Sequence, residues 1–295
     1  RQRQMCIRDR MKTIEKIQKF MSEATKTAAS LVKVPLMSGR PSPASSARRD
    51  TVIIMGNGPS LKEALTIHRE VLDSTPKLAV NWSAMTPDFL VLKPEYYLLA
   101  DGVFFNPAAS DNVPKLWDIV NRIDWPLTIF VPARFRKYPG LKTLPKNITV
   151  KYFNLTPAEG WTGVTHRLFR MGLAMPRPRN VLIPAIMCMI REGFRRIVLT
   201  GADHNWSQTL WVTDRNRVVT VQPHYYEDDD DELRRIEELY KDIHIHQLYE
   251  SFAVAFRSYF AVQAYAQSRG VRVLNATPGS FIDAFPRTTL DRLGD

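Results

Sequence analysis

The stretch TVIIMGNGPSLKEAL, Thr51 to Leu65, places a buried-strand pattern, a glycine turn and a helix start in direct succession. Apolar and β-branched residues run into Gly56-Asn57-Gly58-Pro59-Ser60, and Ser60 with Glu63 has the S-x-x-E spacing of a capping box. Free backbone N–H groups and the positive end of a helix dipole collect at such a junction. We therefore predict that the loop binds an anion, typically a phosphate. The alternative is a tight strand-to-helix turn without a ligand.

The spacing of the glycines argues against two common nucleotide-binding loops. A P-loop needs four residues between its glycines and then Gly-Lys-Ser/Thr, whereas only Asn57 separates Gly56 from Gly58. The dinucleotide pattern G-x-G-x-x-G requires glycine where this chain has Leu61. Neither a Walker-type NTPase nor a dinucleotide-binding domain is expected.

Composition and charge exclude several further classes. With 295 residues and 44% hydrophobic residues, the chain has the size and composition of a globular protein with a sizeable core. No membrane-spanning run and no signal-peptide pattern is evident, so the expected location is the cytoplasm. Cys6 and Cys188 lie far apart without metal-ligand neighbours, so neither a disulfide nor a metal site is expected.

The net charge of +11 is concentrated near the N-terminus. Residues 1–50 hold 12 Lys and Arg against 4 Asp and Glu, which leaves +3 for the rest of the chain. That remainder has no basic stripe interleaved with aromatic residues. Nucleic acid is therefore not an expected partner.

Three segments precede the predicted domain. Residues 1–10, RQRQMCIRDR, lack periodicity and resemble a non-native remnant, and residues 38–50 have the composition of a flexible linker. Residues 11–37 predict an amphipathic basic helix, which lies on an anionic membrane surface, pairs with a partner helix or packs on its own domain. The sequence leaves these three interpretations open. The apolar stripe comprises Ile14, Ile17, Met21, Ala24, Ala28 and Leu31.

Residues 51–295 predict one α/β domain with a Rossmann-like, mostly parallel sheet flanked by helices, because strand-like runs alternate with helical patterns. The predicted strands are 51–55, 77–81, 96–100, 127–131, 149–153, 196–200 and 271–274, and the predicted helices are 60–72, 115–123, 180–193, 231–243 and 246–269. In such sheets ligands bind beyond the carboxyl ends of the strands. Small polar residues recur at these ends, which favours a polar ligand site. They include Gly56 to Ser60, Asn81, Asp101, Asn106, Gly201 to Trp206 and Asn275 to Ser280.

Several blocks of the chain resemble a known group of enzymes. In order, these blocks are VIIMGNGPSLKE, VFFNP (103–107), IVLTGAD (197–203), PHYY (223–226) and PGSFIDAFP (278–286). Over roughly residues 51–290 they resemble the family 42 bacterial sialyltransferases and the broader MptE-like superfamily, which includes archaeal 6-hydroxymethylpterin diphosphokinases and flagellar-glycosylation transferases. The resemblance is more specific for the superfamily than for one substrate.

The sialyltransferase resemblance implies metal-independent and cofactor-independent transfer of a sialic-acid-like, nonulosonic sugar. The donor would be a CMP-sugar, and the acceptor would be a hydroxyl of a glycan or glycolipid in bacterial surface-glycan synthesis. A location at the inner face of the membrane and a homo-oligomer would be compatible with it. The resemblance places these residues at the nucleotide and donor site: Gly56, Asn57, Gly58, Pro59, Ser60, Asn81, Asp101, Asn106, Arg179, Asn180, Gly201, Asp203, Trp211 and Tyr225.

The catalytic pattern of the family matches this chain less well. The family motif His-Tyr-x-x-His has its general base at the second histidine, where this chain has Asp228. His224, Asp228 and His204 are therefore all candidate bases. The two tyrosines that hold the leaving phosphate in the family fall on Asn205 and Trp211. These departures motivate a further interpretation, a nucleotide-binding protein without catalysis.

Two other features have alternative interpretations. The acidic run from Glu227 to Glu232 would bind Mg²⁺ with ATP in a pyrophosphokinase, or it is a solvated loop. Leu210 to Gln222 predicts a hairpin, which is either a lid over the site or a structural insertion.

Overall fold

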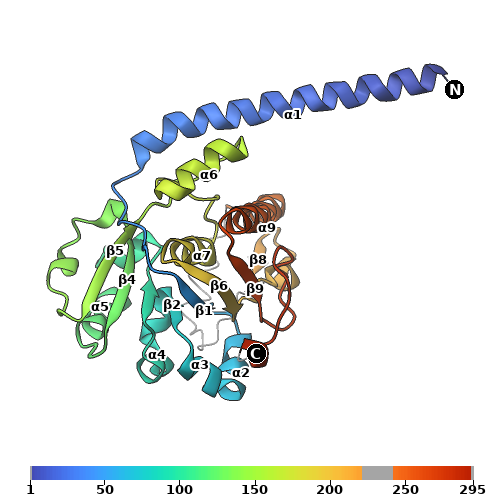
Figure 1. The fold of residues 1–295 in the computed structure, drawn as a ribbon. Coiled ribbons are helices and arrows are strands. Elements are labelled where there is room, and N and C mark those ends of the chain that lie inside the picture. Colours follow the sequence, from blue (N-terminus) through green and yellow to red (C-terminus); the bar gives the residue numbers. More distant parts are fainter. Residues whose placement is uncertain (1, 221–241, 294–295) are drawn as a thin grey trace.

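The structure, a computed structural model, describes residues 2–220 and 242–293, without the side chains of residues 2–13 and 220. A parallel seven-stranded sheet with the order β5-β4-β3-β2-β1-β6-β9 forms its centre (Figure 1). The α/β, Rossmann-like fold class is thereby confirmed. The strands are β1 (Arg49–Met55), β2 (Lys77–Val80), β3 (Tyr96–Leu98), β4 (Leu127–Pro132), β5 (Ile148–Phe153), β6 (Phe194–Thr200) and β9 (Arg272–Asn275).

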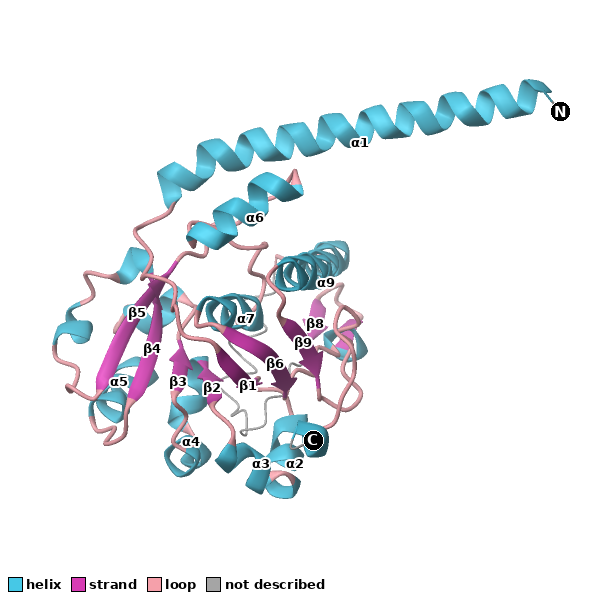
Figure 2. Cartoon of the chain, in the orientation of Figure 1, coloured by secondary structure: helices cyan, strands magenta, loops and turns pink. Residues whose placement is uncertain are grey.

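Helices cover both faces of the sheet, which explains why its strands are apolar without alternation (Figure 2). Along β1, Val52 and Ile54 pack in one core with α7, whereas Ile53 and Met55 pack in a second core on the other face. The first face carries α7 (Leu182–Arg191) and α9 (Ile245–Ser268), and the second carries α2 (Ser60–Ile67), α3 (Arg69–Ser74), α4 (Pro87–Leu92) and α5 (Asn112–Asn121).

The seven predicted strands are confirmed to within two residues at each end. The predicted helix 60–72 is two helices, α2 and α3, separated at His68. The sequence missed α4 and α6 (Thr162–Met171), and α6 buries only Thr165 and Phe169, so its apolar signal is weak. Most of the predicted helix 231–243 lies outside the described residues. The predicted hairpin is confirmed as β7 (Leu210–Val212) paired with β8 (Val218–Thr220).

The order of the strands reverses beside β1. The chain builds β1 to β5 outward on one side, and then places β6 and β9 on the other side of β1. The carboxyl ends of β1 and β6 therefore form the topological switch point, where open parallel sheets bind their ligands. The glycine loop after β1 and the Gly201–Asp203 segment after β6 both lie there.

The N-terminal helix α1 (Gln2–Met37) packs on its own domain through a narrow polar face. The backbone N–H of Trp161 donates to Thr27 Oγ1 at 2.8 Å, and Ser30 Oγ donates to the carbonyl of Glu159 at 2.9 Å. Gly160 permits this close approach, because its φ is +114° and a Cβ there would lie 2.1 Å from Thr27 Oγ1. Helix α1 is thus anchored by small side chains, and it continues through residues 2–10, for which a non-native origin stays a prediction.

The predicted apolar stripe of α1 is not its packing face. Ile17, Met21 and Leu31 are 56%, 59% and 51% exposed, whereas Thr27, Ser30 and Val34 are buried. The interpretation that the helix packs on its own domain is therefore confirmed for Thr27, Ser30 and Val34, and the stripe takes no part in that packing. These exposed side chains lie on a helix that extends beyond the sheet and its covering helices (Figure 1).

The segment before β1 is fixed to the domain, so the prediction of a flexible linker is wrong for its residues. Ser42 exchanges two hydrogen bonds with Tyr152 of the edge strand β5, donating its N–H to the carbonyl and accepting from the N–H through Oγ. Asn154 bonds both the N–H and the carbonyl of Gly39. The segment thereby covers part of the exposed edge of the sheet, and β1 begins at Arg49.

Candidate functional site

Two loops meet at the switch point through direct backbone hydrogen bonds. The N–H of Gly56 donates to the carbonyl of Thr200 at 2.8 Å, and the N–H of Gly58 donates to the carbonyl of Gly201 at 2.9 Å. A Cβ on Gly56 would lie 2.4 Å from the Gly201 oxygen, and one on Gly201, where φ is +64°, would lie 2.4 Å from the Gly56 oxygen. The glycines of both motifs are therefore required by the contact between the loops.

The carboxylate of Asp203 occupies the N-terminus of α2. Its Oδ2 accepts from Ser60 Oγ at 2.7 Å and its Oδ1 accepts from the N–H of Ser60 at 3.3 Å. Ser60 is the first helical residue, and the predicted capping box is wrong because its hydroxyl donates to Asp203. The backbone N–H groups of Gly56, Gly58 and Ser60, which were predicted to be free, are all hydrogen-bonded within the protein. The anion that the helix terminus stabilises in this structure is the protein's own side chain.

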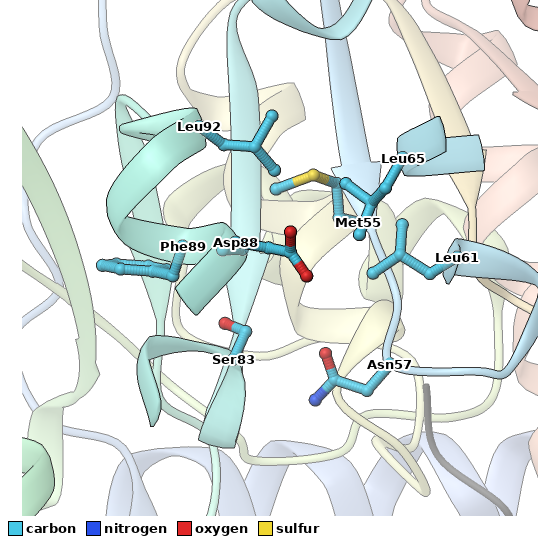
Figure 3. Close-up of a pocket in the computed structure, with 9 residues that line it drawn as sticks. Met55, Asn57, Leu61, Leu65, Ser83, Asp88, Phe89 and Leu92 are labelled. Atoms are coloured by element: carbon cyan, nitrogen blue, oxygen red, sulfur yellow. The ribbon is translucent and has the colours of Figure 1, made fainter. Parts of the chain in front are cut away.

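Asn57 points the opposite way, toward β2 and a small cavity. Its Nδ2 donates to the carbonyl of Val80 at 3.3 Å, while its buried Oδ1 and the buried Ser83 Oγ have no partner among the described residues. Figure 3 shows Asn57, Ser83 and Asp88 around this cavity, whose volume of about 10 Å³ is close to that of one water position. The polar groups here match a water or a single polar substituent in size.

The predicted residues after β2 and β3 stabilise the local backbone. Asn81, at φ +49°, accepts from the N–H of Ala100 through Oδ1 and receives the Tyr97 hydroxyl at its carbonyl. Asp101 and Asn106 are exposed and accept from backbone N–H groups two residues further along. These residues lie at the same edge of the sheet as the glycine loop, as predicted from the parallel order.

The segment from Asn275 to Ser280 fixes the loop after β6 through hydrogen bonds to the backbone of Ala202. Thr277 Oγ1 accepts from the N–H of Ala202 at 3.0 Å, and Ser280 Oγ donates to the carbonyl of Ala202 at 2.6 Å. Asn275, Thr277 and Ser280 are all buried. This segment therefore supports the site and does not line it with free polar groups.

His204 begins a hydrogen-bonded relay that connects β6 to the helical layer. Its Nε2 lies 2.8 Å from the Tyr259 hydroxyl, which lies 2.9 Å from Asn180 Oδ1. Asn180 Oδ1 also accepts the N–H of Leu182 at the start of α7, so it acts as an acceptor throughout. Tyr259 thus donates its proton to Asn180 and accepts from the Nε2–H of His204. The imidazole is left with Nδ1 as its acceptor atom.

Burial sets the protonation of this relay. It lowers the pKa of His204 to about 3 and raises the pKa of Tyr259 well above its ordinary value. His204 is therefore neutral at physiological pH and presents a hydrogen-bond acceptor. The sequence suggested His204 as a candidate base but gave no functional role to Tyr259, because a tyrosine within an apolar helix carries no sign of its hydroxyl partner.

The low pKa of His204 predicts a loss of stability in acid. The pKa of this histidine is near 6.5 in the unfolded chain and about 3 in the folded protein. Between these pH values the unfolded chain binds a proton that the folded protein does not bind, which favours unfolding. Stability is complete above pH 6.5 and falls as the pH drops toward 3, by up to about 2 kcal/mol between pH 7 and 5. Urea unfolding at pH 7 and pH 5 should show a smaller loss of stability in His204→Asn, because this variant lacks the titrating imidazole. Asparagine is chosen because it tolerates the φ of +52° at this position. An equal loss in both proteins would contradict this pKa.

The structure brings together only part of the predicted site. The glycine loop, Gly201 and Asp203 form one cluster, with Asn81 directly after the neighbouring strand β2, and Asn180 joins His204 through Tyr259. Trp211 is exposed on β7 and Arg179 is exposed before α7. His224, Tyr225 and Asp228 lie outside the described residues, as does the acidic run. The lid role of the hairpin and the assigned ligand contacts stay predictions.

Neither a metal site nor a membrane span is evident in the part of the chain that the structure describes. No group of three or more His, Cys, Asp and Glu side chains there is placed to hold a metal ion. No described helix has both the length and the apolar character needed to cross a bilayer.

Comparison with known proteins gives a weak match among solved structures. No protein-family model matches the chain, and no curated protein matches it. Among solved structures, the chain is similar to the MAf glycosyltransferase from Magnetospirillum magneticum AMB-1, with a TM-score of 0.48 and 15% sequence identity. The match covers 93% of this chain but 39% of that protein, so this chain spans well under half of its length. At this similarity the match establishes neither a family nor an activity.

Proposed function

We propose that the protein is a glycosyltransferase that transfers a nonulosonic sugar from a CMP donor to a hydroxyl of a glycan or glycolipid. The observation that carries the proposal is the meeting of the G-N-G-P-S and G-A-D loops at the switch point of a parallel sheet, beside the amides of Asn57 and Asn81. Amide side chains can bind a nucleotide phosphate without a metal. The proposed site therefore suits CMP as the leaving group, because its phosphate is negatively charged.

The chemistry requires an acceptor for one proton. The acceptor hydroxyl attacks the anomeric carbon, the bond from that carbon to the CMP phosphate breaks, and a base takes the hydroxyl proton. His204 offers a neutral Nδ1, but its pKa of about 3 makes it a weak base and suits it better to orienting the hydroxyl. His224 and Asp228 stay the alternative bases.

The competing functions differ in the ligand that they require. A pyrophosphokinase needs ATP with Mg²⁺, whereas the transferase needs CMP without metal. We would titrate the full chain calorimetrically with CMP and with ATP, each with and without Mg²⁺. Binding of CMP alone supports the transferase, and magnesium-dependent binding of ATP alone replaces it with the kinase. CMP binding without release of CMP from any CMP-sugar identifies a binding protein without catalysis.

Asn57→Ala tests the proposed nucleotide site directly. We expect CMP affinity to fall at least tenfold, because a buried amide contact to a ligand contributes about 1.5 kcal/mol or more. The melting temperature should change by only a few degrees, since the substitution removes one long bond to Val80 together with an unpartnered buried oxygen. Unfolding without a separate loss of CMP binding would show that the loop is structural.

We further propose that α1 holds the enzyme on an anionic membrane surface. Ile14, Ile17, Met21 and Leu31 are exposed on one side of the helix. Lys16, Lys19 and Lys26 lie on other sides of the same helix, and residues 1–50 carry a net charge of +8. An exposed apolar face combined with lysine enrichment is typical of helices that lie in a membrane interface. If the stripe instead pairs with a second copy of the chain or with another helix, that pairing replaces the proposed membrane contact.

A further inference from the structure

A groove of about 510 Å³ lies between α1, α6 and α9, with the segments 158–162 and 176–179 completing its walls. These three helices lie on the same side of the sheet (Figure 1). The volume is within the range of small-molecule sites in proteins. The groove is assembled from segments that are distant in sequence, so no local motif reveals it.

The lining of the groove combines apolar side chains with charged ones. Ala158, Phe169, Ala261 and Ala264 contribute apolar surface, and the first two are buried. Lys26, Arg177, Arg179 and Arg257 contribute cationic groups. A ligand that fits this lining has an apolar part and an anionic head.

Two of the four cations already have carboxylate partners. Arg177 donates to both oxygens of Glu159, at 3.2 and 2.6 Å, and this hydrogen bonding lowers the pKa of Glu159. Lys26 lies 3.1 Å from Glu23. Arg179 and Arg257 have no carboxylate within 4.0 Å in the described ranges 2–220 and 242–293. Among the described residues, the groove therefore holds two guanidinium groups without a carboxylate partner.

We propose that this groove binds a phosphate-monoester amphiphile, with the phosphate on Arg179 and Arg257 and the apolar part on Phe169 and the alanines of the lining. A phosphate monoester carries a charge of about −1.5 to −2 near pH 7, which matches the two arginines that have no carboxylate partner in the described part of the chain. Guanidinium groups also bind phosphate oxygens with paired N–H donors. The phosphate comes from a membrane lipid or from a soluble phosphate ester, and the apolar part of the lining favours the lipid. This proposal does not depend on glycosyl transfer.

The test is calorimetric titration of the full chain with dihexanoylphosphatidic acid below its micelle concentration. We expect one site per chain, a tenfold weaker affinity in Arg257→Ala and a loss of 50-fold or more in Arg179→Ala/Arg257→Ala. Arg122→Ala is the matched control, because Arg122 is an exposed arginine at the end of α5, outside the groove, and it should bind within twofold of the wild type. Arg257→Lys should recover part of the affinity, since it restores the charge.

Further titrations separate the sources of the phosphate. Inorganic phosphate binding as tightly as the lipid would identify a soluble phosphate as the ligand, while dihexanoylphosphatidylcholine should not bind. No binding of either phosphate probe at millimolar concentration, or equal affinity in the wild type and the double variant, would overturn the proposal. All variants should keep the wild-type melting temperature, because both arginines are exposed. Arg257→Ala should keep CMP affinity, so failure here is distinguishable from failure of the proposed function.

Discussion

Gly201→Ala should lower the free energy of unfolding by about 3 kcal/mol or more, through two costs that act together. Gly201 has a φ of +64°, which costs a residue with a side chain about 1 kcal/mol or somewhat more. The new Cβ would also lie 2.4 Å from the Gly56 oxygen and 2.9 Å from Leu61 Cβ. Because the Gly56 oxygen is backbone, one of the two loops must move.

The matched control for this variant is Gly270→Ala. Gly270 has nearly the same φ, +68°, but nothing lies within 4 Å of the Cβ that alanine would add. Urea unfolding should therefore show a loss of only about 1 kcal/mol in Gly270→Ala. Equal losses in the two variants would show that the contact between the loops contributes no energy. The excess loss in Gly201→Ala measures how tightly the two loops are packed.

The double substitution Ile17→Glu/Met21→Glu should reduce binding to phosphatidylglycerol vesicles by about 100-fold. Each removed side chain contributes roughly 1.5 kcal/mol or more when it enters the apolar part of a membrane. The charges that replace them are also repelled by the anionic surface. Co-sedimentation with vesicles measures the change, and phosphatidylcholine vesicles should bind the wild type far more weakly.

A variant with the same charge on another side of α1 separates apolar burial from electrostatics. Ser22 and Ala29 are exposed and lie away from the stripe on the helical wheel. Ser22→Glu/Ala29→Glu should therefore weaken vesicle binding by only a fewfold. If the stripe variant instead binds vesicles normally and converts a dimer to a monomer in light scattering, the stripe is a protein interface and the membrane proposal is wrong.

The sequence predicted the sheet well because its signals are local. Buried parallel strands are short apolar runs between turns, and all seven are found where the pattern places them. The order of the strands also placed Asn81, Asp101 and Gly201 at one edge, as expected from a parallel arrangement. Helix α6 was missed because few of its side chains are buried, and helix periodicity depends on burial.

The chemistry of the loop could not be predicted from its own residues. The sequence correctly placed the helix start at Ser60, but Asp203, 143 residues later, takes the position expected for a bound anion. In the same way, Asn180, His204 and Tyr259 are joined only by tertiary packing. The packing face of α1 could not be predicted for a related reason, since periodicity identifies an apolar face but not the surface that covers it.

The docking of α1 has a consequence for where the protein can act. Thr27 and Ser30 fix the helix to the 158–161 loop, and Ser42 fixes the following segment to β5. The helix is therefore attached rigidly to the domain and not through a flexible tether. A flexible tether would allow the strand ends to sample many heights and tilts above a bilayer. If α1 lies on a membrane as proposed, its rigid attachment selects one height and one tilt, and a proposed acceptor hydroxyl would have to be presented at that fixed distance from the surface.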